Sequence, residues 1–264
     1  MANVTYPNHV LANKFEDQYA TRLDLMQFCT VDDSLVGVAG DKVIINTYTA
    51  TDGTETLAMG EGNTKDIEVN YEPQEYTIEL LQNRFSYFDE EAMRDPKTIE
   101  KGLEHMAVDM FNTANKKAMA EFQKATLKAD VTAFDFAAFV DGVALFNIEN
   151  EDVSIFALCH KDDVKEIRKN LKDSLQYSEA YVRTGYIGSV AGVPIYTSNL
   201  ATAGTVILAT KKAVTYFNKK GTEIEQPPRD SSDANIHKNT VFSRKYGIFA
   251  FTDATQAVKL VKTA

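Results

Sequence analysis

The chemically reactive side chains of this chain are few and widely spaced. Its four histidines share no ligand spacing and lie at His9, His105, His160 and His237. Zinc sites commonly use pairs such as His-x-x-x-His or Cys-x-x-Cys, and neither pair occurs here. His105 falls within a predicted helix, and we expect it to be a partly exposed residue of that helix. The sequence therefore predicts no metal site.

The two cysteines, Cys29 and Cys159, also match no metal-ligand spacing. A free cysteine behaves as a small hydrophobic residue and is among the most buried residue types. We therefore predict two buried, unpaired thiols, with a disulfide or a nucleophilic thiol as the alternatives.

Glycines and acidic residues do not form a recognisable site either. Gly185, Gly188 and Gly192 loosely resemble a dinucleotide-binding loop, but their spacing is wrong and Pro194 stands where a helix would have to open. There is no Gly-Lys-Ser/Thr phosphate loop and no Gly-x-Ser-x-Gly elbow. A catalytic carboxylate pair needs two acids in different environments, which the adjacent acids at 89–91 do not supply. We predict no catalytic residue, no cofactor site and no enzymatic activity.

Composition narrows the functional class further. The chain has 264 residues, 44% hydrophobic and 25% charged, as in an ordinary globular protein. Its 38 acidic against 28 basic residues give a net charge of −10, which argues against a sequence-specific DNA-binding protein. No apolar run is long enough to span a bilayer, and the first twenty residues lack a signal-peptide pattern. We expect a reducing, aqueous compartment and no membrane.

A long polar β-hairpin is predicted within residues 41–75. Residues 42–49 are rich in β-branched and aromatic side chains, Thr51–Thr54 contains the turn dipeptide Asp-Gly, and a strand pattern resumes at 66–71. Strands this polar cannot bury a face within one small domain, so we expect the hairpin to project and contact other copies of the chain.

The expected contacts with neighbouring copies come from the hairpin and from an N-terminal arm over residues 1–40. In the arm, a short helix is predicted around 15–28, with few internal partners. The residues expected to make these contacts are Lys42, Ile44, Tyr48, Asp52, Glu61, Lys65, Phe15 and Tyr19.

One long amphipathic helix is predicted from Pro96 to about Lys124. Asp95 is a favourable N-cap, and Pro96 is tolerated at the first helical position. At 1.5 Å per residue the helix would be roughly 43 Å long, a spine along which other elements can lie. Its expected core residues recur at spacings of three and four: Ile99, Leu103, Met106, Met110, Phe111 and Phe122.

The remaining segments mix helices and strands. Helices are predicted at 134–147 and 162–172, and a polar loop at 219–239. Strands are predicted at 153–159, 186–198, 206–210, 213–217, 240–252 and 257–261. A hairpin, a long helix and then mixed elements indicate an α+β fold rather than a doubly wound sheet.

In this order, the elements resemble a known family over most of residues 40–262. The resembling stretches are Gly40–Ile45 with Ala58–Gly62, Tyr76–Leu80 through Phe88–Glu91, Asp95–Lys124, and Gly192-Val193-Pro194 with Ser198-Asn199, Thr205–Ala209 and the closing strands. Together they are similar to the major capsid proteins of tailed bacteriophages, which have the HK97-type fold.

The resemblance implies a domain layout and a structural function. It implies an N-terminal arm at 1–40, an extended loop at 41–75, a peripheral domain at 76–131 and 240–264 with the spine helix at 96–124, and an axial domain at 132–239. It also implies self-assembly, as hexamers and pentamers, into an icosahedral shell that encloses double-stranded phage DNA without sequence-specific binding. The expected location is the virion capsid, after assembly in the host bacterial cytoplasm, with a portal as a further partner.

Two features depart from the family pattern. Many members begin with a fused scaffolding segment, whereas this sequence reaches the hairpin within about forty residues of Met1. We therefore expect a separate scaffolding protein, or guidance of assembly by the arm itself. Some relatives cross-link their subunits through Lys and Asn, but no motif here assigns that role to Lys42 or Lys65.

Three other interpretations remain. An encapsulin-like nanocompartment shares the fold but encloses enzymes. A tail-tube subunit could use a long hairpin, although such tubes are mainly β and lack a spine helix. An α+β enzyme with an unrecognised site is the alternative from a different class.

Overall fold

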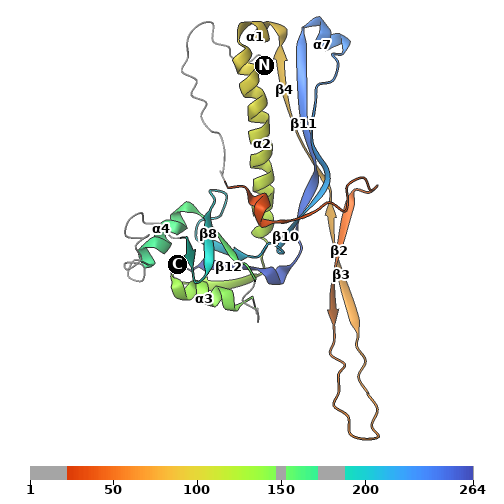
Figure 1. Ribbon diagram of the computed structural model, residues 1–264, viewed down its shortest axis with the longest axis vertical. Coiled ribbons are helices and arrows are strands. Elements are labelled where there is room, and N and C mark those ends of the chain that lie inside the picture. The colour runs from red at the N-terminus through yellow and green to blue at the C-terminus, as the bar shows by residue number, and fades with distance from the viewer. Residues whose placement is uncertain (1–22, 147–152, 172–187, 264) are drawn as a thin grey trace.

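The computed structural model describes residues 23–146, 153–171 and 188–263. They form an α+β fold built around one long helix, α2 (Pro96–Phe122), with a sheet beside it, a second sheet at its C-terminal end and a projecting hairpin (Figure 1). The predicted fold class is therefore confirmed.

The first sheet has four strands in the order β1-β10-β11-β4 and lies beside α2. Its strands are β1 (Thr30–Asp32), β10 (Val214–Glu225), β11 (Lys238–Phe251) and β4 (Glu79–Phe88). The long strands β4 and β11 pair antiparallel from Lys238↔Phe88 to Gly247↔Glu79. Register shifts interrupt the β10–β11 ladder on either side of Lys220.

The second sheet has six strands in the order β5-β12-β9-β6-β8-β7. Its strands are β5 (Leu127–Val131), β12 (Ala257–Lys262), β9 (Thr205–Ala209), β6 (Phe156–Cys159), β8 (Val193–Thr197) and β7 (Ser189–Val190). Helix α3 (Phe136–Ala144) contacts β5 and β12, and α4 (Lys161–Asn170) adds Ile167 to the same hydrophobic cluster. Helix α3 lies within its predicted range and α4 begins one residue before its own, although residues 147 and 172 are outside the described residues.

The two sheets divide the chain differently from the expected domain ranges. The residues of β5 and β12, which the expected ranges place in the domain of the long helix, pair in the six-stranded sheet, and no strand was predicted at β5. Strand β10, expected in the other domain, pairs with β11 beside α2. Strand pairing joins segments far apart in sequence, so each sheet combines strands from both expected ranges.

The predicted polar loop at 219–239 is wrong. Strand β10 continues to Glu225, a short helix α7 (Ser231–Asn235) follows, and β11 begins at Lys238. The extension of β10 forms backbone hydrogen bonds with β11, and its side chains are mostly exposed. Polar side chains are compatible with such a strand because they remain in contact with water.

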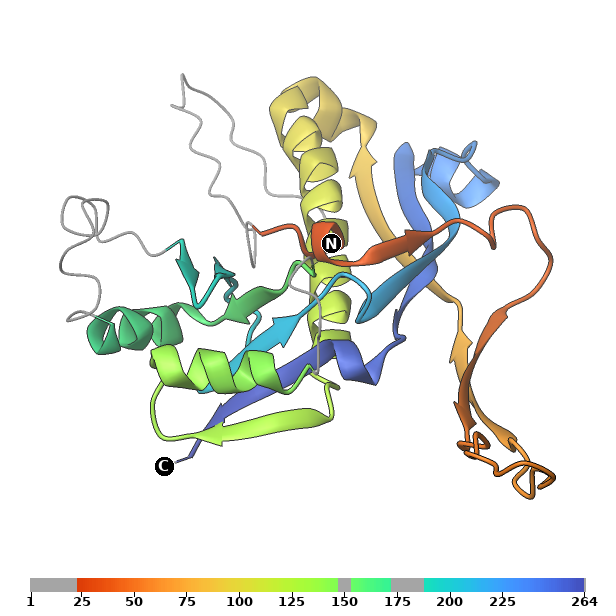
Figure 2. The same ribbon diagram turned by 60° about the horizontal axis from the view of Figure 1, so that its bottom comes forward.

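Part of the N-terminal arm belongs to the subunit's own core rather than to a neighbour. A 3₁₀ helix, η1 (Leu25–Phe28), buries Leu25 and Phe28, and β1 pairs parallel with β10. The backbone N–H of Leu25 donates a 2.7 Å hydrogen bond to Oδ1 of buried Asn115 on α2. Figure 2 shows this red segment crossing α2 toward the four-stranded sheet.

Helix α2 begins as predicted and ends two residues early. The Asp95 carboxylate accepts hydrogen bonds from Lys97 N at 3.2 Å and Thr98 Oγ1 at 2.7 Å, and Pro96 occupies the first turn. Near its start, Gly102 leaves room for the ring of Phe85 on β4, because an added Cβ would lie 2.3 Å from that ring. Glycine there lets the helix approach the sheet closely.

Not all of the expected helix core is buried. Met106, Met110 and Phe122 are buried, Ile99 and Phe111 are half-buried, and Leu103 is 39% exposed. Val108, Asn115 and Met119 are buried as well, which the residue spacing did not predict. The C-terminal half of α2 lies where both sheets meet, so more of its circumference is covered than that of the N-terminal half.

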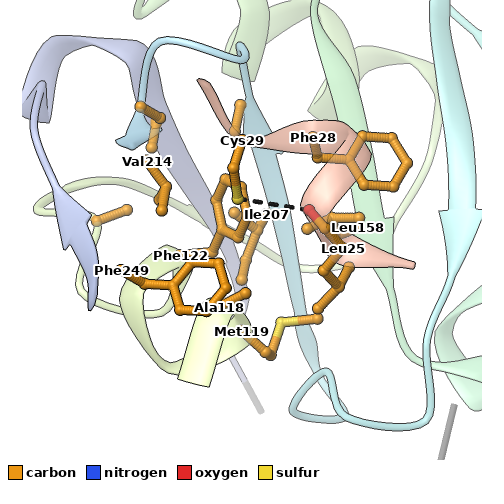
Figure 3. Close-up of a cluster of buried hydrophobic side chains, with 14 of the residues drawn as sticks. Leu25, Phe28, Cys29, Ala118, Met119, Phe122, Leu158, Ile207, Val214 and Phe249 are labelled. Atoms are coloured by element: carbon orange, nitrogen blue, oxygen red, sulfur yellow. Dashed lines mark hydrogen bonds between the residues drawn. The ribbon is translucent and has the colours of Figure 1, made fainter. Parts of the chain in front are cut away.

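One hydrophobic cluster joins the end of α2 to both sheets (Figure 3). The ring of Phe156 on β6 lies 4.6 Å from that of Phe28 and 5.9 Å from that of Phe122, centroid to centroid. Val214 and Phe249 bring β10 and β11 into the same cluster. A second cluster fills the space between the six-stranded sheet and its helices.

Replacing Phe122 with Ala should destabilise the subunit by about 3–5 kcal/mol, because its fully buried ring would leave a cavity where both sheets meet. Urea unfolding of the full chain measures this loss. The control Met93→Ala, at a side chain 84% exposed, should change stability by less than about 0.5 kcal/mol. A loss below about 1 kcal/mol for Phe122→Ala would contradict the packing described here.

Both cysteines are free and buried, as predicted, so the folded protein should react slowly with thiol reagents. Burial raises the pKa of Cys29 to about 12 and raises the pKa of Cys159 as well, with Asp24 and Asp163 adding to the respective shifts. At pH 8 we expect labelling by a disulfide reagent to be at least roughly 100-fold slower in the folded than in the urea-unfolded chain. Equal rates in the two states would show that these thiols are accessible.

Candidate functional site

The hairpin of β2 (Lys42–Ala50) and β3 (Val69–Thr77) is exposed along most of both strands. Its strands pair antiparallel from Lys42↔Thr77 to Ala50↔Val69, and the hairpin extends away from both sheets (Figure 1). Near its base, Ile78 N donates to Asp41 O at 2.8 Å and Tyr76 Oη donates to Phe251 O at 2.9 Å. The hairpin is thus anchored at one end and free along its length, as the sequence predicted.

One face of this ribbon is apolar and exposed. We call Ile44, Tyr48, Val69 and Tyr71 the apolar hairpin face; each is between 56% and 65% exposed. Tyr48 is directly opposite Tyr71, and their ring centroids lie 6.2 Å apart. Residues directly opposite each other in an antiparallel pair share a face, and successive residues alternate between faces.

The outer part of the opposite face is polar, whereas Val43, Ile45 and Tyr76 lie on that face nearer the base and are half-buried. Thr47 is opposite Glu72, and Thr49 is opposite Asn70. This outer part can remain in water at no cost, whereas burying one large apolar side chain of the other face would contribute about 1.5–3 kcal/mol. The hairpin therefore presents a single face suited to contact.

The tip of the hairpin is held by its own polar contacts. The Glu55 carboxylate accepts hydrogen bonds from Thr64 N at 2.8 Å and Thr64 Oγ1 at 3.0 Å. Asn63 Nδ2 donates to Gly53 O at 3.2 Å and to Lys65 O at 2.9 Å. These bonds give the tip a defined shape even though it touches no sheet.

The expected contact residues fall into three groups. Ile44 and Tyr48 are on the apolar hairpin face, next to Lys42, whose ammonium lies 3.0 Å from the Glu75 carboxylate in an exposed and hence weak ion pair. The tip holds exposed Asp52, Glu61 and Lys65. Phe15 and Tyr19 lie outside the described residues.

The second strand also contributes Val69 and Tyr71 to the apolar hairpin face, and neither was among the predicted contact residues. Val69 and Tyr71 were assigned to a strand but not to its exposed face. Their two-residue spacing and their positions opposite Ala50 and Tyr48 could have revealed them.

A second surface feature is a groove of about 630 Å³ between α2 and the strands β10 and β11. We call it the helix groove. Buried Met106, Met110 and Val241 line it together with the more exposed Leu103 and Ile224.

The helix groove has a polar end. Asp24, Asn115 and Lys245 line it there, and the Lys245 ammonium lies 4.9 Å from the ring centroid of Tyr216. Partial burial lowers the pKa of Lys245, and the nearby Asp24 carboxylate opposes that shift.

The acidic run at 89–91 has a structural position. It forms the first turn of α1 (Asp89–Arg94), where negative charge is favourable. Asp89 Oδ1 accepts hydrogen bonds from Asn239 Nδ2 at 2.8 Å and from Arg229 Nη2 at 2.5 Å, and the Arg229 hydrogen bond lowers the pKa of Asp89. These contacts tie α1 to the start of β11 and to the segment that precedes it.

The described residues contain no group of three or more His, Cys, Asp or Glu side chains arranged to hold a metal ion. No helix in the described part of the chain has both the length and the hydropathy needed to cross a membrane.

No protein-family model and no curated protein sequence matches this chain. Solved structures do match it over nearly its whole length. The capsid of cyanophage P-SCSP1u is 14% identical, with a TM-score of 0.75, and the match covers 99% of this chain and 93% of that one. The capsid of the native GTA particle is 13% identical, with a TM-score of 0.70 and coverage of 99% and 96%.

An encapsulin also matches. The SrpI encapsulin of Synechococcus elongatus is 11% identical, with a TM-score of 0.63, covering 98% of this chain and 92% of that one. Identities this low establish the fold alone. The chain has the fold of phage capsid subunits and of this encapsulin, which confirms the HK97-type fold that the sequence resembled.

Proposed function

We propose that this chain is the major capsid subunit of a tailed bacteriophage, and that its copies assemble into an icosahedral shell around double-stranded DNA. The observation that carries the proposal is the apolar hairpin face, which is exposed in the single chain and projects far from its core. A chain with the fold of capsid subunits and an unburied contact surface is suited to assembly with its own copies.

The geometry favours heterologous contacts. The apolar hairpin face lies well away from the sheets, so a neighbour can bury it against a different part of its own surface. Such contacts close into rings when the rotation between copies allows it, which is how hexamers and pentamers would form. Obligate interfaces commonly bury about 2,000–5,000 Å², and the hairpin would supply one part of that area.

The proposal assigns roles to the main parts of the fold. The four-stranded sheet with α2 corresponds to a peripheral domain, the six-stranded sheet with α3 and α4 to an axial domain, and the hairpin to the extended loop. A separate scaffolding protein, a portal and packaged DNA bound without sequence specificity are the further partners. Assembly would take place in the host bacterial cytoplasm, and the location of the product would be the virion capsid.

An encapsulin-like shell is the second candidate, because the SrpI encapsulin shares the fold. The contents of purified particles separate the two. Nuclease-resistant DNA inside particles isolated from phage lysates supports the capsid, whereas an enclosed enzyme without DNA supports the nanocompartment. An enzyme of the α+β class has no such structural observation in its favour.

Replacing Tyr48 and Tyr71 together with Asp should abolish shell formation and leave the subunit folded. Two charges would replace the centre of the apolar hairpin face, and neither side chain belongs to a buried cluster. Negative-stain microscopy of the protein expressed with its scaffold should show particles tens of nanometres wide for the unchanged chain and at least a roughly tenfold loss for the variant.

The matched control is Thr49→Asp with Asn70→Asp. It places the same two charges opposite each other one residue along the hairpin, on the polar face. This control should still form shells and should unfold at the same temperature as the tyrosine variant. Normal shells from the tyrosine variant, or loss of shells in both, would remove the assigned role of the apolar hairpin face.

A further inference from the structure

The helix groove combines a buried apolar floor with an open apolar rim. Side chains that are at least nine-tenths buried line its floor, among them Met106 and Met110, whereas Leu103 and Ile224 on its rim are 39% and 73% exposed. The groove follows α2 from Leu103 to Asn115, a rise of about 18 Å. Its volume of about 630 Å³ is typical of a small-molecule site. A ligand with a long apolar body therefore fits this shape and would bury the rim.

One cationic group lies at the polar end of the helix groove. Val241, Ser243 and Lys245 alternate along β11 and all line the groove, so they share the face of the sheet that faces α2. Lys245 is half-buried, and its ammonium lies 4.9 Å from the ring centroid of Tyr216. Among the residues that the structure describes, no side chain or carbonyl forms a hydrogen bond or an ion pair with this ammonium. Its hydrogen-bonding capacity is therefore available to a ligand.

The charge of Lys245 is only partly compensated. Asp24 lines the same end of the groove, where its carboxylate caps η1 by accepting the backbone N–H of Met26 at 3.0 Å. Burial lowers the pKa of Lys245, and the attraction of Asp24 offsets only part of that shift. A bound anion would stabilise the charged ammonium, because a buried charge is unfavourable unless it is paired. The polar end of the groove therefore favours an anionic group over a neutral one.

We propose that the helix groove binds one linear aliphatic carboxylate, with its alkyl chain between α2 and the strands β10 and β11 and its carboxylate on the Lys245 ammonium. An alkyl chain presents only apolar surface to the floor and the rim. An extended peptide would bring backbone N–H and C=O groups that this apolar lining cannot satisfy. The site is separate from the apolar hairpin face, and the proposal does not depend on shell formation.

Methionine methyl resonances of the unassembled full-length subunit test whether the ligand enters the groove. Met106 and Met110 line the groove, whereas Met59 and Met93 are exposed elsewhere. Decanoate, added below its micelle concentration, should shift the two groove resonances saturably and leave the other two unchanged. Octanoate should bind about 15-fold more weakly, because each buried methylene contributes a factor of roughly four. Equal shifts at all four methyl groups, or no saturable shift at Met106 and Met110, would overturn the proposal.

Substitution of Lys245 then tests the anionic part of the ligand. Lys245→Met keeps an unbranched side chain and removes the charge, so it should weaken decanoate binding at least about tenfold and change the affinity for uncharged decanol less than about twofold. The control Lys116→Met removes the same charge from an exposed residue of α2 that does not line the groove, and should change neither affinity. Unchanged decanoate binding in Lys245→Met, or an equal loss of decanol binding, would overturn the role of this ammonium and with it the proposal.

Discussion

The packing of aromatic side chains at the C-terminal end of α2 is the interaction on which the rest of this structure depends. Phe122 and Phe28 both contact Phe156, and the cluster around them includes residues from η1, α2 and both sheets. In the described part of the chain the two sheets share no ladder hydrogen bond, so this cluster fixes one sheet relative to the other. Because α2 runs from this cluster along the four-stranded sheet, the orientation of the long helix is fixed there as well.

The contact between Gly102 and Phe85 positions the N-terminal part of α2 against the four-stranded sheet. With no Cβ at residue 102, the Phe85 ring of β4 can approach the helix backbone. Together with the cap at Asp95 and the bonds between Asp89, Arg229 and Asn239, this contact keeps α1, α2 and the far end of β11 together. The end of the subunit opposite the six-stranded sheet is therefore defined largely by specific polar contacts, with less buried apolar surface.

Local signals made much of this fold predictable. Asp95-Pro96 and the spacing after it gave the start of α2, and the Asp-Gly turn with its flanking β-branched residues gave the hairpin. Pairing between distant segments was not predictable from one sequence, which is why the expected domain ranges separate β10 from β11 and β12 from β9, although each pair shares a sheet. The burial of Leu25 and Phe28 was missed for the same reason, since their partners on α2, β6 and β8 lie far along the chain. Exposure at Leu103 depends on which side of the helix the sheet covers, and residue spacing does not reveal that.

Because the hairpin is anchored at its base and projects from the core, substitutions in the hairpin and substitutions in the core are selected against in different ways. Tyr48 and Tyr71 contribute to no buried cluster, whereas Phe122 and Phe156 contribute to one that spans the molecule. Chaperones and proteases recognise unfolded chains, so they would remove a variant damaged at Phe122 but not one damaged at Tyr48. Defective copies of the second kind would persist at normal abundance beside intact ones and could enter the same product. Whether a substitution in the hairpin is tolerated therefore depends on the mixture of copies that assemble together and not on the stability of the single chain.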